Sequence, residues 1–130
     1  MLKLKLDKFS LQRIIDTTRV SRVIRAYLRD LKAEIARLMR LPKTGQRYQK
    51  PNGRFYQASA PGEAPAIRTG ALLRSVKEAF PKWSTGALSI DANYAGFLER
   101  GTARMRARPF VRPALRTVNS RFQDVRIRLG

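Results

Sequence analysis

The segment from Tyr94 to Leu115 reads YAGFLERGTARMRARPFVRPAL, and it guides the interpretation of the whole chain. It combines a short apolar-periodic turn, a glycine stop at Gly101 and a stretch rich in arginine. Pro113 then suits the first position of a final helix, because proline lacks an N–H that would have no partner there. We call residues 100–112 the Arg-rich crossing. No nucleophile with a plausible base lies in this segment, so it predicts contacts rather than catalysis.

Two helices are expected to flank the crossing. Asn93 is expected to cap a short helix that carries Tyr94, Phe97 and Leu98. Glu99, next to Arg100, is expected to form a surface ion pair of small energetic value. The side chain of Phe110 is expected to be buried in the hydrophobic core. The apolar stripe of the final helix is predicted at Leu115, Val118, Phe122, Val125 and Leu129.

Length and composition exclude several functional classes. The chain has 130 residues, which suits one domain spanning 1–130, and it contains neither Cys nor His. Thiolate catalysis, imidazole bases and Cys/His zinc sites are therefore excluded, and we expect no enzymatic activity, no metal and no cofactor. No apolar run reaches about 18 residues, so no membrane span is expected. The N-terminus lacks a signal-peptide core, so synthesis in a cytoplasm is the default.

The net charge of +19 requires anionic partners, because so many like charges on one small chain repel one another. Arginine outnumbers lysine 20 to 8, which favours fixed, bidentate contacts. Nucleic acid, an acidic protein surface and a membrane face all remain open on composition alone.

The N-terminal part is predicted to contain a long amphipathic helix. Residues 1–16 are expected to form an arm or a short element: Leu2, Leu4 and Leu6 alternate like a strand, and Ser10 suits the cap of a short helical turn. From Thr18 to Met39 one face is apolar, with Val20, Val23, Ile24, Tyr27, Leu31, Ile35 and Leu38. The opposite face carries Arg19, Arg22, Arg25 and Arg29. This basic face is either a solvated surface or a contact for phosphate or an acidic neighbour.

Residues 43–68 are predicted to form a hairpin followed by an extended loop. Lys50-Pro51-Asn52-Gly53 suits a turn with Gly53 at positive φ, which sets Tyr48 opposite Tyr56. These aromatics, among basic residues, either pack on the protein or stack on bases. Two prolines stiffen the loop at 58–68 and favour an extended arm that lies against a neighbour.

The remaining chain, 69–130, is predicted to form the core. Thr69 suits the N-cap of a short helix, and strands are expected at 76–83 and 85–92. Pro81 indicates that the first of them either lies at an edge or stops there. Glu78 and Asp91 are able to approach each other across these strands, although a paired-carboxylate site is disfavoured against a solvated pair. The predicted fold class is α+β: a long N-terminal helix and a C-terminal helix packed on a small, mostly antiparallel sheet, with an extended proline-containing loop.

Several short motifs in a fixed order resemble those of tail-completion, or head–tail joining, proteins of long-tailed bacteriophages, also labelled neck or morphogenesis proteins. The resemblance covers residues 44–118, and the last block is the most specific. The matching blocks are Ser59–Pro65 (SAPGEAP), Thr69–Leu72 (TGAL), Tyr94–Ala95, Leu98–Thr102 (LERGT), Arg104–Met105, Ala107–Phe110 (ARPF) and Arg112–Leu115 (RPAL).

The resemblance implies a structural virion protein of the neck, without an enzymatic step, assembled in the host cytoplasm. It implies a homo-oligomeric ring, expected to be hexameric, between the head connector or adaptor and the tail terminator or tail tube, with a channel for DNA. The alternative is a basic nucleic-acid-binding protein that uses Arg19, Arg22, Arg25 and Arg29. Interface candidates are Pro61, Glu63, Pro65, Gly101, Thr102, Arg104, Met105, Arg106 and Arg108, and structural roles are expected for Thr69, Gly70, Phe110 and Pro113.

Overall fold

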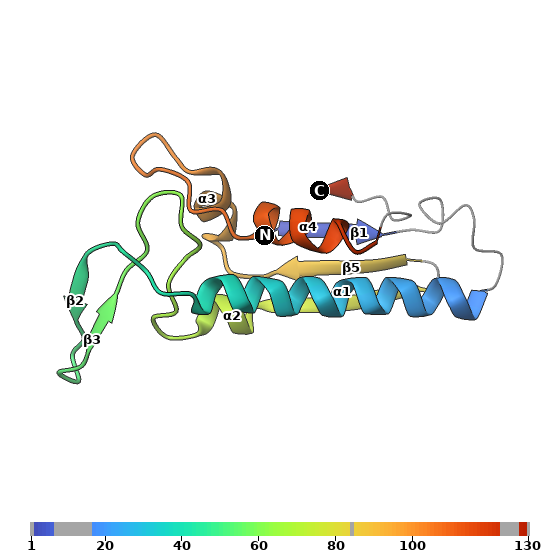
Figure 1. The fold of residues 1–130 in the computed structure, drawn as a ribbon, viewed down its shortest axis with the longest axis horizontal. Helices are drawn as coiled ribbons and strands as arrows, with labels where there is room; N and C mark the ends of the chain where they lie inside the picture. Colours follow the sequence, from blue (N-terminus) through green and yellow to red (C-terminus); the bar gives the residue numbers. More distant parts are fainter. Residues whose placement is uncertain (1, 7–16, 84, 123–127, 130) are drawn as a thin grey trace.

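The computed structural model describes residues 2–6, 17–83, 85–122 and 128–129, and it has the α+β architecture that the sequence predicts (Figure 1). The helices are α1 (Thr17–Arg40), α2 (Ala71–Arg74), α3 (Ala95–Arg100) and α4 (Val111–Asn119). The strands are β1 (Leu2–Leu6), β2 (Arg47–Gln49), β3 (Phe55–Gln57), β4 (Val76–Lys82), β5 (Thr85–Ile90) and β6 (Arg128–Leu129).

The main sheet has four strands in the order β4-β5-β1-β6, with antiparallel neighbours. The two strands predicted at 76–83 and 85–92 are confirmed, and β4 lies at an edge, where Pro81 costs no ladder hydrogen bond. Residues 2–6 form a strand rather than a free arm, since Leu4 pairs with Leu88 in β5. The helical turn predicted after Ser10 lies outside the described residues.

The core lies where α1 packs against the sheet. Ile24, Tyr27, Leu31 and Ile35 of the predicted apolar face are fully buried, and Leu28, which was not predicted, is buried beside them. The side chain of Val20 lies outside the description. Gly86 in β5 makes the close approach possible, because a Cβ built on it would lie 2.6 Å from Ile24 and 2.7 Å from Leu28.

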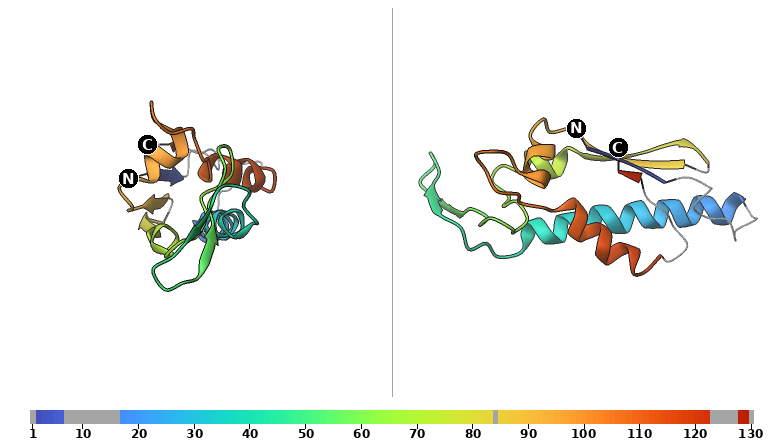
Figure 2. Two further views of the ribbon diagram at one scale, coloured as in Figure 1. Left: turned by 90° about the vertical axis from the view of Figure 1, so that its left-hand side faces the viewer. Right: turned by 90° about the horizontal axis from the view of Figure 1, so that it is seen from above.

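The helix α4 contacts α1 and slants away from it, as the view from above in Figure 2 shows. The buried hydroxyl of Tyr27 donates a 2.5 Å hydrogen bond to Oδ1 of Asn119, and burial raises the pKa of Tyr27, which keeps it a donor. Its ring packs edge-on against Phe122 at 5.3 Å. Phe110 is fully buried, as predicted.

The predicted final helix extends too far. The helix ends at Asn119, and the chain continues in tight turns in which Arg121 and Phe122 donate to carbonyls three residues earlier, those of Val118 and Asn119. Leu129 lies in β6 beside β1, so its place on the apolar stripe is wrong, and Val125 lies outside the described residues. Phe122 continues the helical spacing of apolar residues, but it packs against the core from the turns that follow α4. The pattern therefore predicts a helix that is too long.

The β2–β3 hairpin extends from one end of the molecule, away from the main sheet (Figures 1 and 2). Its predicted register is confirmed: Tyr48 pairs with Tyr56, with stacked rings 5.6 Å apart. Gly53 has a φ of 83° and donates to the carbonyl of Lys50, which closes the turn.

Candidate functional site

The segments that carry the motif blocks meet at the end of the molecule that bears the hairpin. The proline-containing loop, residues 58–68, and the Arg-rich crossing are about forty residues apart in sequence, yet the N–H of Gly62 donates to the carbonyl of Ala107 at 2.9 Å. The loop is joined in turn to the base of the hairpin, where the N–H of Gly45 donates to the carbonyl of Ala58 at 2.9 Å. We call this assembly the loop end.

Glu99 fixes the crossing to α4, and the predicted surface ion pair is wrong. Its side chain is buried, and its carboxylate accepts hydrogen bonds from the backbone N–H groups of Phe110 at 2.8 Å, Val111 at 3.0 Å and Arg112 at 2.9 Å. These groups begin α4 and have no acceptor within the helix. A carboxylate at this position also interacts favourably with the positive end of the helix dipole.

Pro113 is the third residue of α4 rather than the first, so its predicted position is wrong by two residues. The shift has a simple reason. Glu99 satisfies the three N–H groups before Pro113, and Pro113 has no N–H to satisfy. Together they account for the unpaired donors at the start of the helix.

The crossing is fastened at both ends. Gly101 ends α3 with a φ of 77°, a conformation that favours glycine. A Cβ at this position would also lie 2.8 Å from the amide nitrogen of Ala107 and 2.9 Å from the carbonyl oxygen of Met105. Further along, the N–H of Arg108 donates to the carbonyl of Leu98 at 2.7 Å. Residues 102–106 therefore form a loop with fixed ends.

Glu63 holds the proline-containing loop against the segment that follows α1. Its carboxylate accepts hydrogen bonds from the hydroxyl of Thr44, from the N–H of Thr44 at 3.1 Å and from the N–H of Ala60 at 2.8 Å. These bonds, led by the one from the Thr44 hydroxyl, hold the pKa of Glu63 below its usual value.

The loop end brings the predicted interface residues together but exposes them unequally. Its exposed members are Pro61, Thr102, Arg104 and Arg106. Glu63, Gly101, Met105 and Arg108 are half-buried, and Pro65 is buried. Contact with a partner through these residues stays a prediction, and the four exposed residues are the ones placed to make it.

The short elements beside the crossing differ in detail from expectation. The N-cap of α2 is Gly70, with a φ of 81°, although the hydroxyl of Thr69 still accepts a hydrogen bond from the N–H of Ala71 at 3.3 Å. The N-cap of α3 is Tyr94 rather than Asn93. Tyr94 and Phe97 are exposed, at 46% and 57%, because α3 buries Ala95, Gly96 and Glu99 instead.

The basic face of α1 is present on the surface. Arg22, Arg25 and Arg29 are exposed. The guanidinium of Arg25 lies over the ring of Phe80 at 4.1 Å, and Arg29 lies 3.9 Å from Asp30. Arg19 belongs to α1, but its side chain lies outside the description.

The structure does not bring Glu78 and Asp91 together, in line with the disfavoured status of a paired-carboxylate site. The register places Glu78 opposite Leu88, and the carboxylate of Asp91 pairs with Nζ of Lys77 at 3.0 Å. Across the described residues, no group of three or more acidic side chains gathers to hold a metal ion. Within the same residues, no helix is both long enough and apolar enough to cross a membrane.

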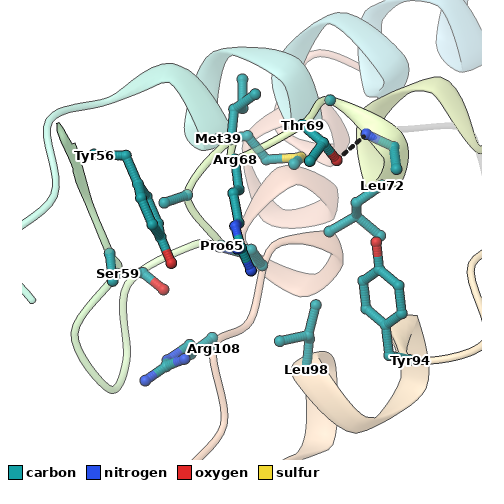
Figure 3. A pocket seen from close by; sticks show the side chains of 15 residues that line it. Met39, Tyr56, Ser59, Pro65, Arg68, Thr69, Leu72, Tyr94, Leu98 and Arg108 are labelled. Carbon is teal, nitrogen blue, oxygen red and sulfur yellow. Dashed lines mark hydrogen bonds between the residues drawn. The ribbon is translucent and has the colours of Figure 1, made fainter. Parts of the chain in front are cut away.

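The loop end contains a cavity of about 350 Å³ that no sequence pattern predicted (Figure 3). It lies between the base of the hairpin, the proline-containing loop, the start of α2, α3 and the crossing. Ser59 and Arg68 line it, and neither had been assigned to a site; Tyr56, considered above for base stacking, lines it as well. No protein-family model, curated protein or solved structure matches this chain.

Proposed function

We propose that the chain is a structural protein of the neck of a long-tailed bacteriophage or related particle. In this proposal it repeats around an axis as a closed ring, expected to be hexameric, that joins the head connector to the tail and lets DNA pass. The ring has no catalytic step. The proposal starts from the ordered motif blocks at 59–72 and 94–115, which resemble head–tail joining proteins.

The observation that carries the proposal is the convergence of these blocks at the loop end. Residues far apart in sequence are held together there by backbone hydrogen bonds and by two carboxylates, Glu63 and Glu99. These hydrogen bonds hold the backbone around the exposed residues in one conformation. A surface of this kind suits rigid contact with a partner better than a flexible linker does. Arg104 and Arg106, at this tip, have the side-chain type enriched in the centres of protein interfaces.

Ring closure needs two dissimilar surfaces on each copy, because a head-to-tail contact joins different patches. The molecule is elongated, with the hairpin and the loop end at one extremity; the β4–β5 turn lies toward the other, near the start of α1 (Figure 1). Trp83, 52% exposed, precedes that turn. These two extremities are candidates for the paired surfaces.

The decisive experiment removes the protein from the particle that encodes it. Heads filled with DNA and separate tails are expected to accumulate, and adding the purified chain should restore joining. Joined, infective particles in its absence would refute the proposal. Electron microscopy of the restored particles should then show a ring at the neck.

A second candidate function, duplex DNA binding, is supported by the exposed Arg22, Arg25 and Arg29 on one face of α1. Binding of this kind weakens with salt by about 0.9 log units per log unit of salt for each phosphate neutralised. Tight binding of the isolated chain to duplex DNA at physiological salt, lost in Arg22→Glu/Arg29→Glu, would favour it. Weak binding that is insensitive to this pair of substitutions would exclude it.

A further inference from the structure

The cavity at the loop end has the size and lining of a binding pocket. Its volume of about 350 Å³ falls in the range of small-ligand sites. Figure 3 shows Tyr56, Ser59 and Arg108 on one side and Leu72 and Tyr94 on the other. It therefore offers polar and apolar walls within one enclosure.

The charged side chains that line the cavity are all positive. Arg68 and Arg108 both line the cavity, and no Asp or Glu is among its described lining residues. Lys50 adds to the positive charge nearby: its Nζ donates to the carbonyl of Arg68 at 3.0 Å and lies 5.8 Å from the centre of the Tyr56 ring. An anion entering the cavity would be attracted from several directions.

Arg108 has an unused donor in this lining. Its Nε is buried and has no hydrogen-bond partner among the described residues. A buried, unpaired donor is destabilising, so its presence calls for an explanation. The guanidinium of Arg108 also forms no ion pair among the described residues, so its remaining N–H groups can pair with an acceptor that enters the cavity.

We infer that this cavity binds a carboxylate presented by a segment of an acidic partner protein, next to an apolar side chain of that segment. Guanidinium groups recognise carboxylates through paired, charge-assisted hydrogen bonds. The walls formed by Met39, Leu72 and Leu98 match an apolar neighbour of that carboxylate. A phosphodiester of DNA has sugars rather than apolar groups beside it, so the same walls would stay unfilled.

A second copy of this chain is a poorer occupant, because most of the carboxylates that the structure describes already have bonded partners. Of the six acidic residues that the structure describes, Glu78 alone is exposed and has no bonded partner there. The other five, Asp30, Glu34, Glu63, Asp91 and Glu99, bond to basic side chains, to a hydroxyl or to backbone N–H groups. A net charge of +19 also makes an acidic partner the favourable one.

The test uses the isolated full chain and a displayed library of short random peptides. Enriched peptides are expected to contain Asp, Glu or a free C-terminal carboxylate beside an apolar residue. Replacing that acid by its amide in a synthetic peptide should weaken binding at least about tenfold. Arg108→Met should cause a similar loss, whereas Arg116→Met, on the exposed face of α4, should not.

Folding of the variants is checked by thermal unfolding. Arg108→Met removes an unpaired donor, so its melting temperature should not fall, and Arg68→Met at the exposed rim provides a second variant. The inference is overturned if no acid-bearing peptide is enriched, if the amide peptide binds equally well, or if Arg116→Met weakens binding as much as Arg108→Met. It is also overturned if a duplex oligonucleotide, or a peptide with the sequence of the strand that contains Glu78, competes for the cavity more strongly than the selected peptides do.

Peptide binding does not require ring formation. A negative result would therefore leave the proposed neck function standing.

Discussion

Replacing Glu99 by Gln should destabilise the protein far more than a surface substitution does. One carboxylate oxygen accepts from Phe110 and Val111, and the other accepts from Arg112. The amide of Gln keeps one acceptor but turns an NH₂ group toward the remaining N–H. Two hydrogen bonds then lose their ionic character, at about 1 kcal/mol each, and one donor is left unpaired, at about 1–3 kcal/mol. The expected loss in the free energy of unfolding is about 3–5 kcal/mol.

The assay is urea unfolding followed by far-ultraviolet circular dichroism, with Glu78→Gln as the matched control. Glu78 is exposed on β4, so its substitution removes the same charge without removing a buried bond. The control should stay within about 0.5 kcal/mol of the parent protein. Equal stability losses in the two variants would show that net charge, rather than the cap on α4, accounts for the effect, and would refute the reasoning.

Three further outcomes are expected. Phe110→Ala should cost about 3–5 kcal/mol in urea unfolding, because the ring is fully buried; a loss below 1 kcal/mol would contradict its place in the core. Arg104→Glu should leave the melting temperature unchanged and reduce ring formation or head–tail joining, as counted by electron microscopy; an unfolded variant would show that the crossing is needed for folding instead. The lowered pKa of Glu63 means that its hydrogen bonds stabilise the loop above the unfolded pKa and are lost as the pH falls through the folded pKa. Amide NMR signals of Thr44 and Ala60 should report this titration in the acid range and lose it in Glu63→Gln.

The elements that the sequence predicted well are those whose pattern is local. Helix α1 has an apolar face over many turns, and the hairpin has a turn sequence that fixes the register of Tyr48 and Tyr56. The edge position of β4 is one of the two outcomes that Pro81 indicated, because proline lacks the N–H that a central strand needs. In these places one short-range rule was enough.

The errors arose where a distant residue decided the local structure. No nearby pattern identifies Glu99 as the cap of a helix that starts eleven or more residues later, and the cap moves Pro113 to the third position. The cavity was missed for the same reason. Arg68 and Arg108 meet because two loops bond through Gly62 and Ala107, a pairing with no local signature.

Because the ends of the loop at 102–106 are fixed, substitutions that affect the fold are separated from substitutions that affect only the exposed surface. Gly101, Glu99 and Arg108 tie the flanks to the body, so substitutions between the ties need not disturb the fold. Such a tip is a graftable position, where variants could acquire new binding preferences while the scaffold keeps its stability. Exchanging only these five residues between divergent chains is thus a way to transplant recognition without redesigning the domain.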